Sequence, residues 1–189
     1  MKYLPLVFIS VFTLTYQSCK QKYDPPSVKL NDLVFNSIFA DNKKDSMHTY
    51  CLLGSGYFRA ETSDDADSII NSWLSKHPNA NVIPVATHGP TLSDYPNSKM
   101  TYCWLIDNND TINNFLIRTG CYEGGTMIRP KTWQEMSNKE KTVWEKDPKI
   151  IVHIDQRTYD KFLDQIKAAE QYAKQHQLGI WNKKKEDEY

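Results

Sequence analysis

The chain has 189 residues, a length that allows one domain with a substantial hydrophobic core. It carries 23 basic and 23 acidic residues, so its formal net charge at neutral pH is zero. This balance does not favour a large nucleic-acid footprint, which normally needs a basic face, although nucleic acid remains possible through local basic clusters. The lysines at residues 183–185 are one such cluster, which we interpret as part of a solvated, charged tail at residues 183–189.

The first 18 residues have the pattern of a signal peptide. Lys2 gives a positive start, residues 4–16 are mostly apolar, and Ser18 stands immediately before Cys19. The arrangement resembles a bacterial lipoprotein signal, which is cleaved before a cysteine that becomes lipid-modified. It implies a chain anchored through Cys19 to a membrane of the cell envelope, facing the periplasm or the cell surface. An uncleaved anchor helix is the alternative, although the apolar run is short for one.

We expect a tether followed by one domain. Residues 19–29 are polar and contain two adjacent prolines, which suits an extended tether between lipid and domain. The domain is expected at residues 30–182. Its first segment, residues 30–39, fits either a short helix or a first strand, and residues 49–59 fit a hairpin or a bulged strand around two glycines.

Residues 64–76 predict an amphipathic helix, capped by Thr62 or Ser63. Asp64 and Asp65 lie in its first turn. These carboxylates are either metal ligands or, as we favour, charges that compensate the helix dipole. The apolar residues that recur along this helix at spacings of three and four are Ala66, Ile69, Ile70, Trp73 and Leu74.

The middle of the chain predicts two strands and a short helix. Residues 81–87 predict a strand at a sheet edge or with a bulge, because Pro84 cannot donate a ladder hydrogen bond. After a loop, residues 101–106 predict a second strand. A turn leads from it into a short helix at residues 112–119, which Gly120 closes.

The rest of the domain predicts two more helices and a further strand. A glycine-rich loop that ends near Arg129 comes first, and a capping box from Thr132 to Glu135 begins a helix. Residues 150–154 are β-rich, and a long amphipathic helix follows at residues 158–176. Strands and helices are interspersed, so the sequence predicts an α+β domain.

Three cysteines remain besides Cys19, namely Cys51, Cys103 and Cys121, and an odd number cannot all pair internally. Cys103 lies on a predicted strand and Cys121 just after the short helix that follows it. Either a disulfide between these two or buried free thiols fit this placement. No Cys or His spacing typical of zinc occurs in the sequence, so we do not expect a zinc site.

Two segments resemble the staphylococcal nuclease (thermonuclease-like) family. The first joins Ile112-Asn113 to Leu116-Ile117-Arg118-Thr119-Gly120, where the family has a valine-asparagine start and a leucine-valine-arginine-x-glycine end. The second joins an alanine- and glutamate-rich helix, residues 168–174, to the close Leu178-Gly179-Ile180-Trp181. The resemblance implies a five-stranded OB-type β-barrel with packed helices, with a helix and a strand inserted at residues 121–155 before the C-terminal helix.

Enzymes of this family hydrolyse the phosphodiesters of DNA or RNA. Acidic residues hold calcium, a glutamate orients the attacking water, and two arginines neutralise the charge that develops on the phosphate. Phosphoryl transfer needs such a set, because cations must stabilise the phosphate oxygens and the nucleophile must be aligned. The resemblance implies counterparts of these residues in an active member.

The sequence departs from the family at those positions. Counting back from Asn113 without gaps places the second catalytic arginine at Met100, beside Lys99. The family's acidic loop has no clean copy, and residues 59–62 are its nearest counterpart. We therefore expect a non-catalytic barrel that acts as a binding or interaction module, with an unknown protein partner and no cofactor.

The alternative is a calcium-dependent extracytoplasmic nuclease with a rearranged active site. Its candidate catalytic residues are Arg59, Glu61 and Arg129, with Lys99 as a further cation, and its candidate metal ligands are Asp64 and Asp65. Convergence of these side chains within reach of one phosphate group would support the enzyme, and scatter over different faces would not.

Overall fold

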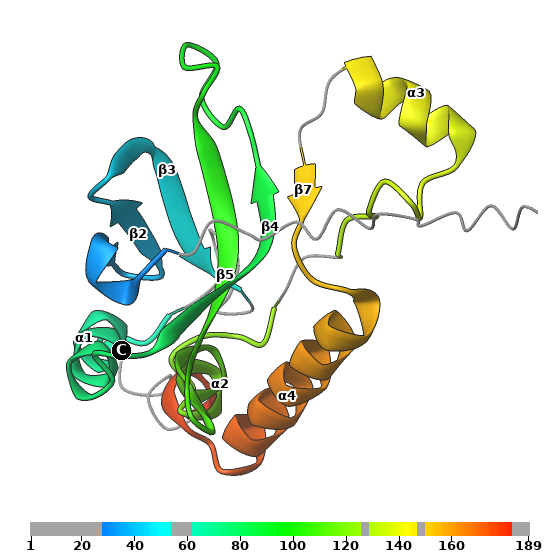
Figure 1. Cartoon of the computed structure of the whole chain (residues 1–189). Helices are drawn as coiled ribbons and strands as arrows, with labels where there is room; N and C mark the ends of the chain where they lie inside the picture. Colours follow the sequence, from blue (N-terminus) through cyan, green and yellow to red (C-terminus); the bar gives the residue numbers. More distant parts are fainter. Residues whose placement is uncertain (1–27, 54–61, 126–128, 147–149, 183–189) are drawn as a thin grey trace, which may run out of the picture.

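The structure, a computed structural model, describes residues 28–53, 62–125, 129–146 and 150–182. Within these residues the chain forms an α+β domain, as predicted, with seven strands in one sheet and four α-helices (Figure 1). The strands are β1 (Leu33–Asn36), β2 (Phe39–Asn42), β3 (Asp45–Leu52), β4 (Asn81–His88), β5 (Lys99–Asp107), β6 (Asp110–Thr111) and β7 (Ile150–Val152). The helices are α1 (Ala66–Lys76), α2 (Ile112–Arg118), α3 (Asn138–Lys146) and α4 (Gln156–Gln175), and 3-10 turns lie at Leu30–Asp32 and Gly179–Trp181.

The strands run in the order β1-β2-β3-β5-β4-β7, and β6 pairs with β5. The pair β3 and β5 is parallel, and the other pairs are antiparallel. The sheet is open, since an isolated bridge between Lys29 and Asn81 is the only pairing of the described residues that links the start of the sheet to β4. The closed five-stranded barrel that we expected is therefore not formed as such, because β7 occupies the edge of β4 at residues 86–88.

The helix and the strand expected between residues 121 and 155 are present as α3 and β7. In Figure 1, β7 lies beside β4, and α3 is set apart from the helices that cover the sheet. The predicted strand around Pro84 is confirmed as β4, which has a register shift between Pro84 and Ala86, as a bulge predicts.

The N-terminal part of the domain forms strands rather than a helix. β1 and β2 pair antiparallel through a tight turn in which Ser37 has a φ of 58°. The expected hairpin at residues 49–59 corresponds in part to β3, and residues 54–61 lie outside the described residues.

Three helices begin at other residues than predicted. α3 begins at Asn138 rather than at the predicted capping box of Thr132 and Glu135, and Ser137 and Glu140 form the capping box at its start. α1 begins at Ala66 and has Asp65 as its N-cap, without a side-chain capping bond. α4 begins at Gln156, because the carboxylate of Asp155 accepts a hydrogen bond from the N–H of Thr158 at 2.7 Å and so caps the helix earlier in the chain.

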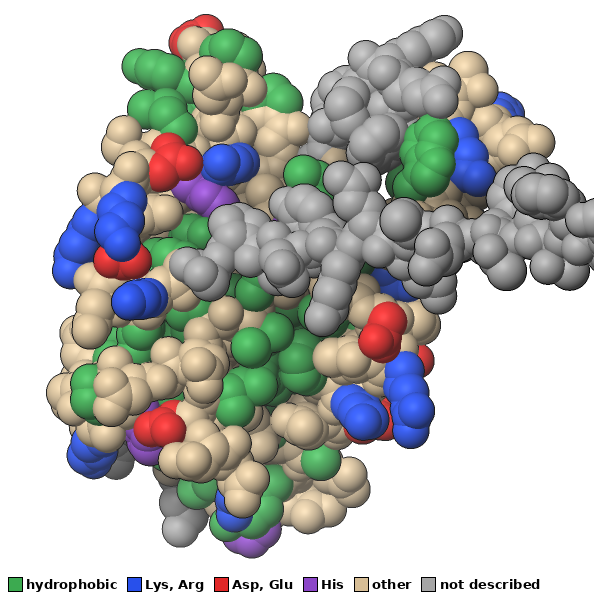
Figure 2. All heavy atoms as spheres, in the orientation of Figure 1, with side chains coloured by type: hydrophobic (Ala, Val, Ile, Leu, Met, Phe, Trp, Pro, Cys, Tyr) green, Lys and Arg blue, Asp and Glu red, His purple; other side chains and the backbone are tan. Residues whose placement is uncertain are grey.

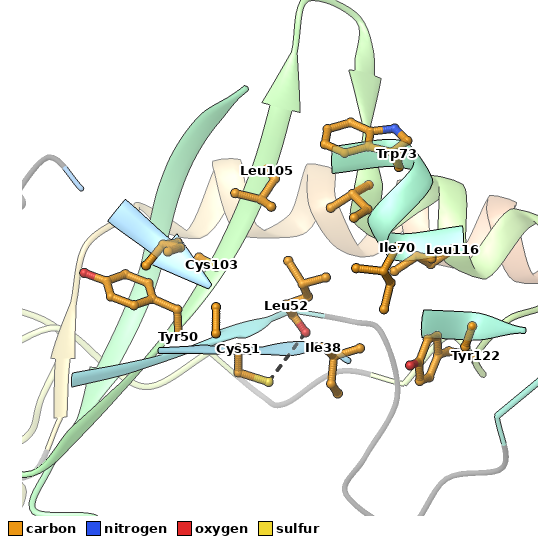
Figure 3. Packing of buried hydrophobic residues seen from close by; sticks show 14 of the residues in the cluster. Ile38, Tyr50, Cys51, Leu52, Ile70, Trp73, Cys103, Leu105, Leu116 and Tyr122 are labelled. Atoms are coloured by element: carbon orange, nitrogen blue, oxygen red, sulfur yellow. Dashed lines mark hydrogen bonds between the residues drawn. The ribbon is translucent and has the colours of Figure 1, made fainter. Parts of the chain in front are cut away.

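Two hydrophobic clusters lie on opposite faces of the sheet. Alternate residues of β5 show this, because Cys103 and Leu105 pack in one cluster and Trp104 packs in the other. The first cluster includes side chains of β2, β3, α1 and α2 (Figure 3). In the second, the ring of Trp104 stacks on Phe162 of α4, with centroids 4.4 Å apart. Burial of each large apolar side chain contributes on the order of 1.5–3 kcal/mol.

A fully buried asparagine joins β5 to α2. The Oδ1 atom of Asn113 accepts a hydrogen bond from the N–H of Leu105 at 3.0 Å. Its Nδ2 group donates to the carbonyls of Leu53 (2.8 Å) and Cys103 (3.1 Å). The predicted strand–turn–helix unit is therefore confirmed, and Asn113 also ties it to the end of β3.

Candidate functional site

A row of hydrogen-bonded polar side chains crosses the sheet near the start of β5. The Nε2 atom of His48, on β3, lies 2.6 Å from the hydroxyl of Thr101 on β5. That hydroxyl lies 2.6 Å from the hydroxyl of Thr87 on β4. The Thr87 hydroxyl in turn lies 2.8 Å from Nε2 of His153, which directly follows β7. We call these four residues the His–Thr chain.

Strand periodicity places the His–Thr chain on the same face as the first hydrophobic cluster. His48 lies two residues before Tyr50 on β3, and Thr101 lies two residues before Cys103 on β5, so each pair shares one face of the sheet. Tyr50 and Cys103 belong to the first hydrophobic cluster. His48 is 6% exposed and Thr101 is 1% exposed. Buried polar groups need hydrogen-bond partners, and these side chains provide them for one another. The apolar core therefore passes into a polar cluster at this end of the sheet.

Both histidines of the His–Thr chain favour the neutral state at pH 7. The pKa of His48 is lowered to about 4, first because burial disfavours the charged ring and second because Lys99 is close. Asp45 opposes this shift, and it also forms an ion pair of 3.4 Å with Lys99. Burial lowers the pKa of His153 as well. The arrangement can hold and pass a proton between β3 and the end of β7.

The second feature of this end of the sheet is the tip of the β4–β5 hairpin, residues 89–98, which we call the hairpin tip (Figure 1). Ser98, 3% exposed, holds its backbone. The Ser98 hydroxyl accepts hydrogen bonds from the N–H groups of Thr91 (2.9 Å) and Leu92 (2.8 Å). The N–H of Ser98 donates to the carbonyl of Tyr95 at 2.9 Å. The tip is therefore an ordered loop with its own internal bonds.

The hairpin tip presents two large apolar side chains to solvent. Leu92 is 54% exposed and Tyr95 is 51% exposed, and the two residues form a β-bridge with each other. Hydrophobic side chains gather over this end of the hairpin in Figure 2. Asp94 is the one charged residue in the tip sequence. The tip offers an apolar surface that a side-chain hydroxyl holds in place from inside.

Arg129, a candidate catalytic residue, has a structural role. Its side chain is 3% exposed. The guanidinium donates to Gln156 Oε1 at 2.8 Å and to the carbonyl of Pro130 at 3.0 Å, and it forms an ion pair with Glu135. Glu135 also accepts from the N–H of Thr132, but no helix begins there, so the capping box predicted at these two residues is wrong as a helix start. Arg129 thus ties the segment before α3 to the start of α4 and does not face a shared site.

The other candidate nuclease residues do not converge within the described residues. Arg59 and Glu61 lie outside them. Asp64 and Asp65 are exposed at the start of α1. In the part of the chain that the structure describes, no group of three or more His, Cys, Asp or Glu side chains is arranged to hold a metal ion.

The position that the resemblance gives to a catalytic arginine lies next to the His–Thr chain. Lys99 pairs in register with His48, and Met100 pairs with Thr49. Met100 is half-buried and packs against the first hydrophobic cluster. The ammonium group of Lys99 is paired with Asp45. At the position where the resemblance leads us to expect an arginine, the structure therefore has the packed side chain of Met100, beside the ion pair of Lys99 with Asp45.

The cysteines Cys51, Cys103 and Cys121 are all buried free thiols. The structure thus has no Cys103–Cys121 disulfide and agrees with the other interpretation of these residues. Burial raises the pKa of Cys51 to about 12 and also raises that of Cys121, so these thiols are poor nucleophiles.

The glycine-rich loop is explained in part by packing. A β-carbon on Gly124 would lie 2.9 Å from Cβ of Glu170 on α4. The N–H of Gly124 donates to the Glu170 carboxylate at 3.2 Å. A glycine is needed here because the loop approaches the helix closely. Residues 126–128 lie outside the described residues.

Sequence reasoning did not find the His–Thr chain. None of its four residues is among the candidate site residues that the sequence indicates. The available signal is that His48 and Thr101 interrupt apolar faces of their strands, where an unpartnered polar group is unfavourable. This pattern predicts that each of these side chains has a hydrogen-bond partner, but it does not identify the partner residue.

No protein-family model matches the sequence, and no curated protein matches it. None of the helices in the described residues has the length and apolar character needed to cross a membrane. The geometry of the His–Thr chain and of the hairpin tip is therefore the basis for inferring a function.

Proposed function

We propose that this chain is a non-catalytic binding module of nuclease-like ancestry, anchored to a membrane of the cell envelope through a lipidated Cys19. The observation that carries the proposal is the hairpin tip, which holds Leu92 and Tyr95 exposed on an ordered backbone. The ligand is a protein surface with an apolar pocket.

The strand order supports a barrel of the OB type. The succession β1-β2-β3-β5-β4, with β3 and β5 parallel, is the order of a five-stranded barrel in which the first strand returns to β4. The bridge between Lys29 and Asn81 lies where this closure would begin. The helix α1 connects β3 to β4, as the resemblance leads us to expect. In this proposal, β7 has taken the remaining edge of β4 and opened the barrel.

The residues around the expected catalytic position support the proposal that the chain does not cleave phosphodiesters. Met100 contributes apolar packing where the family has an arginine, and Lys99 is paired with Asp45. Arg129 is buried and fully engaged. The alternative, a calcium-dependent nuclease, depends on Arg59 and Glu61 with calcium at Asp64 and Asp65.

The composition of the hairpin tip indicates a protein as its partner. Its sequence has no lysine or arginine, so it lacks the cations that bind nucleic-acid phosphates or anionic lipid headgroups. Tyrosine is enriched among the side chains that dominate protein interfaces. Because Ser98 already orders the tip, binding loses little further backbone entropy.

Site-specific photo-crosslinking tests this proposal in the full chain expressed in a bacterial host. A photoreactive amino acid replaces Tyr95, and the matched control carries it at Tyr172, an exposed tyrosine on α4. We expect a discrete protein adduct from position 95, absent from position 172 and lost when Leu92→Asp is added without a change in melting temperature. Adducts with lipid or nucleic acid, or the same adducts from both positions, would contradict the proposed partner.

A further inference from the structure

The His–Thr chain has a fixed count of hydrogens. Its three contacts run from Nε2 of His48 through the hydroxyls of Thr101 and Thr87 to Nε2 of His153. Three hydrogen bonds need three hydrogens, and the two hydroxyls supply two of them. The third must come from one imidazole Nε2. One histidine therefore donates through Nε2 while the other accepts there, so the two neutral rings hold opposite tautomers.

A first additional proton is compatible with this order. It can bind to Nδ1 of the donating ring, and the three contacts keep their three hydrogens. A second proton is not compatible. Both Nε2 atoms then donate, and one hydroxyl hydrogen has no place in the chain. Two buried imidazolium rings also repel each other, and His153 is among the groups that disfavour a charge on His48.

The neighbouring titratable groups do not offset that second charge. Lys99 disfavours it and Asp45 favours it, and these two residues are paired with each other. Asp155 lies close in sequence to His153, but its carboxylate caps α4 through Thr158. The ring of Tyr50 stacks on that of His48, and it supplies no negative charge in this pH range because burial raises its pKa to about 12.

The strand β7 is short and ends at a residue of the His–Thr chain. It has three residues, and β4 is its partner in the sheet, at residues 86–88. Ile151 is 45% exposed, so the strand buries little apolar surface. At its end, the N–H of His153 donates to the carbonyl of Val85 at 2.9 Å, and the ring bonds to Thr87.

We propose that the His–Thr chain is a proton-operated latch, which holds β7 on β4 while at most one of its histidines is charged and releases β7 when both are charged. The latch is independent of what the hairpin tip binds. It makes the pairing of β7 with β4 dependent on the acidity of the compartment. Release is local, since β1, β2 and β3 do not pair with β7.

The test is nuclear magnetic resonance of the full chain labelled with nitrogen-15, measured from about pH 7.5 down to about pH 3.5, so that the range includes the pKa of about 4 of His48. At the upper end we expect one of His48 and His153 to be protonated at Nδ1 and the other at Nε2. On acidification, the amides of Ile151 and Val152 should lose protection from hydrogen exchange before those of β2 and β3. Identical tautomers, or loss of protection in all strands together, would overturn the latch.

Variants separate the latch from a simple loss of packing. His153→Gln keeps an amide that can bond to Thr87 but cannot be charged, so we expect the protection of β7 relative to β3 to become independent of pH. His176→Gln changes an exposed histidine at the C-cap of α4 and should leave the wild-type profile unchanged. A pH dependence that survives in His153→Gln would overturn the proposal, and the tautomers of the wild type decide the matter if this variant does not fold.

Discussion

The backbones of Gly120, which follows α2, and Gly179, which begins the 3-10 turn after α4, are in direct contact. The N–H of Ile180 donates to the carbonyl of Gly120 at 3.0 Å. A β-carbon on Gly179 would overlap that carbonyl, and one on Gly120 would overlap the carbonyl of Leu178. Both glycines also have positive φ angles, 75° and 52°. The two sequence segments that carry the nuclease resemblance are therefore in direct contact.

We expect Gly179→Ala to lower the free energy of unfolding by at least about 2 kcal/mol, because the alanine meets backbone and requires a positive φ. Gly124→Ala is the comparison. Its β-carbon would meet the Glu170 side chain rather than backbone, so the loss should be smaller. Urea unfolding of both variants measures the difference. Equal losses would show that the contact between Gly120 and Gly179 is not special.

Asn113→Ala should lower the free energy of unfolding by about 3 kcal/mol, because the N–H of Leu105 and the carbonyl of Leu53 lose their bonds to its side chain. The carbonyl of Cys103 also loses a bond but still accepts from the N–H of Leu53. Asn114→Ala, at the next position of the same helix, is the control and should change it by less than about 0.5 kcal/mol. Urea unfolding tests both variants. A small effect of Asn113→Ala would mean that water or a rearranged backbone replaces its bonds.

Ser98→Ala should loosen the hairpin tip while leaving the core intact. The N–H of Leu92 loses the acceptor at 2.8 Å, a local cost of about 1–2 kcal/mol. Hydrogen exchange should therefore become faster in the tip and stay unchanged in β3. Ser93→Ala, an exposed serine of the same tip, is the matched control. Unchanged exchange in the Ser98 variant would contradict the role given to this hydroxyl.

Stability should fall as the pH is lowered, in part through His48. Its pKa is about 4 in the folded chain against an ordinary value of 6.5, so the unfolded chain binds more protons between these values. The contribution is complete above about pH 6.5 and is lost as the pH falls towards 4, with an upper limit of about 3 kcal/mol. Urea unfolding at several pH values should show a flatter profile in His48→Gln. A profile identical to the wild type would exclude His48 as a source.

The parts of the fold that the sequence predicts are those determined by local pattern. The strand–turn–helix unit around Asn113 and the glycines at 120 and 179 depend on neighbours in sequence and on backbone conformation. The open sheet was not predicted, because the pairing of β7 with β4 joins segments whose contact has no local signal. The His–Thr chain has the same character, since its bonds join residues 53, 14 and 66 positions apart.

The candidate catalytic residues show that residue type alone does not predict a functional role. Arg129 is a candidate because of its charge and its position in a glycine-rich loop. Charge alone does not distinguish a catalytic arginine from one whose buried side chain binds Gln156 and Glu135.

A cleavage assay of the purified full chain tests most directly the central claim that this chain does not hydrolyse nucleic acid. Single-stranded DNA, double-stranded DNA and RNA are incubated with and without calcium, beside an Arg59→Ala, Glu61→Ala double variant. We predict no cleavage by the wild type above the level of the double variant in either condition. Calcium-dependent cleavage that disappears in the double variant would contradict the binding module and establish the nuclease.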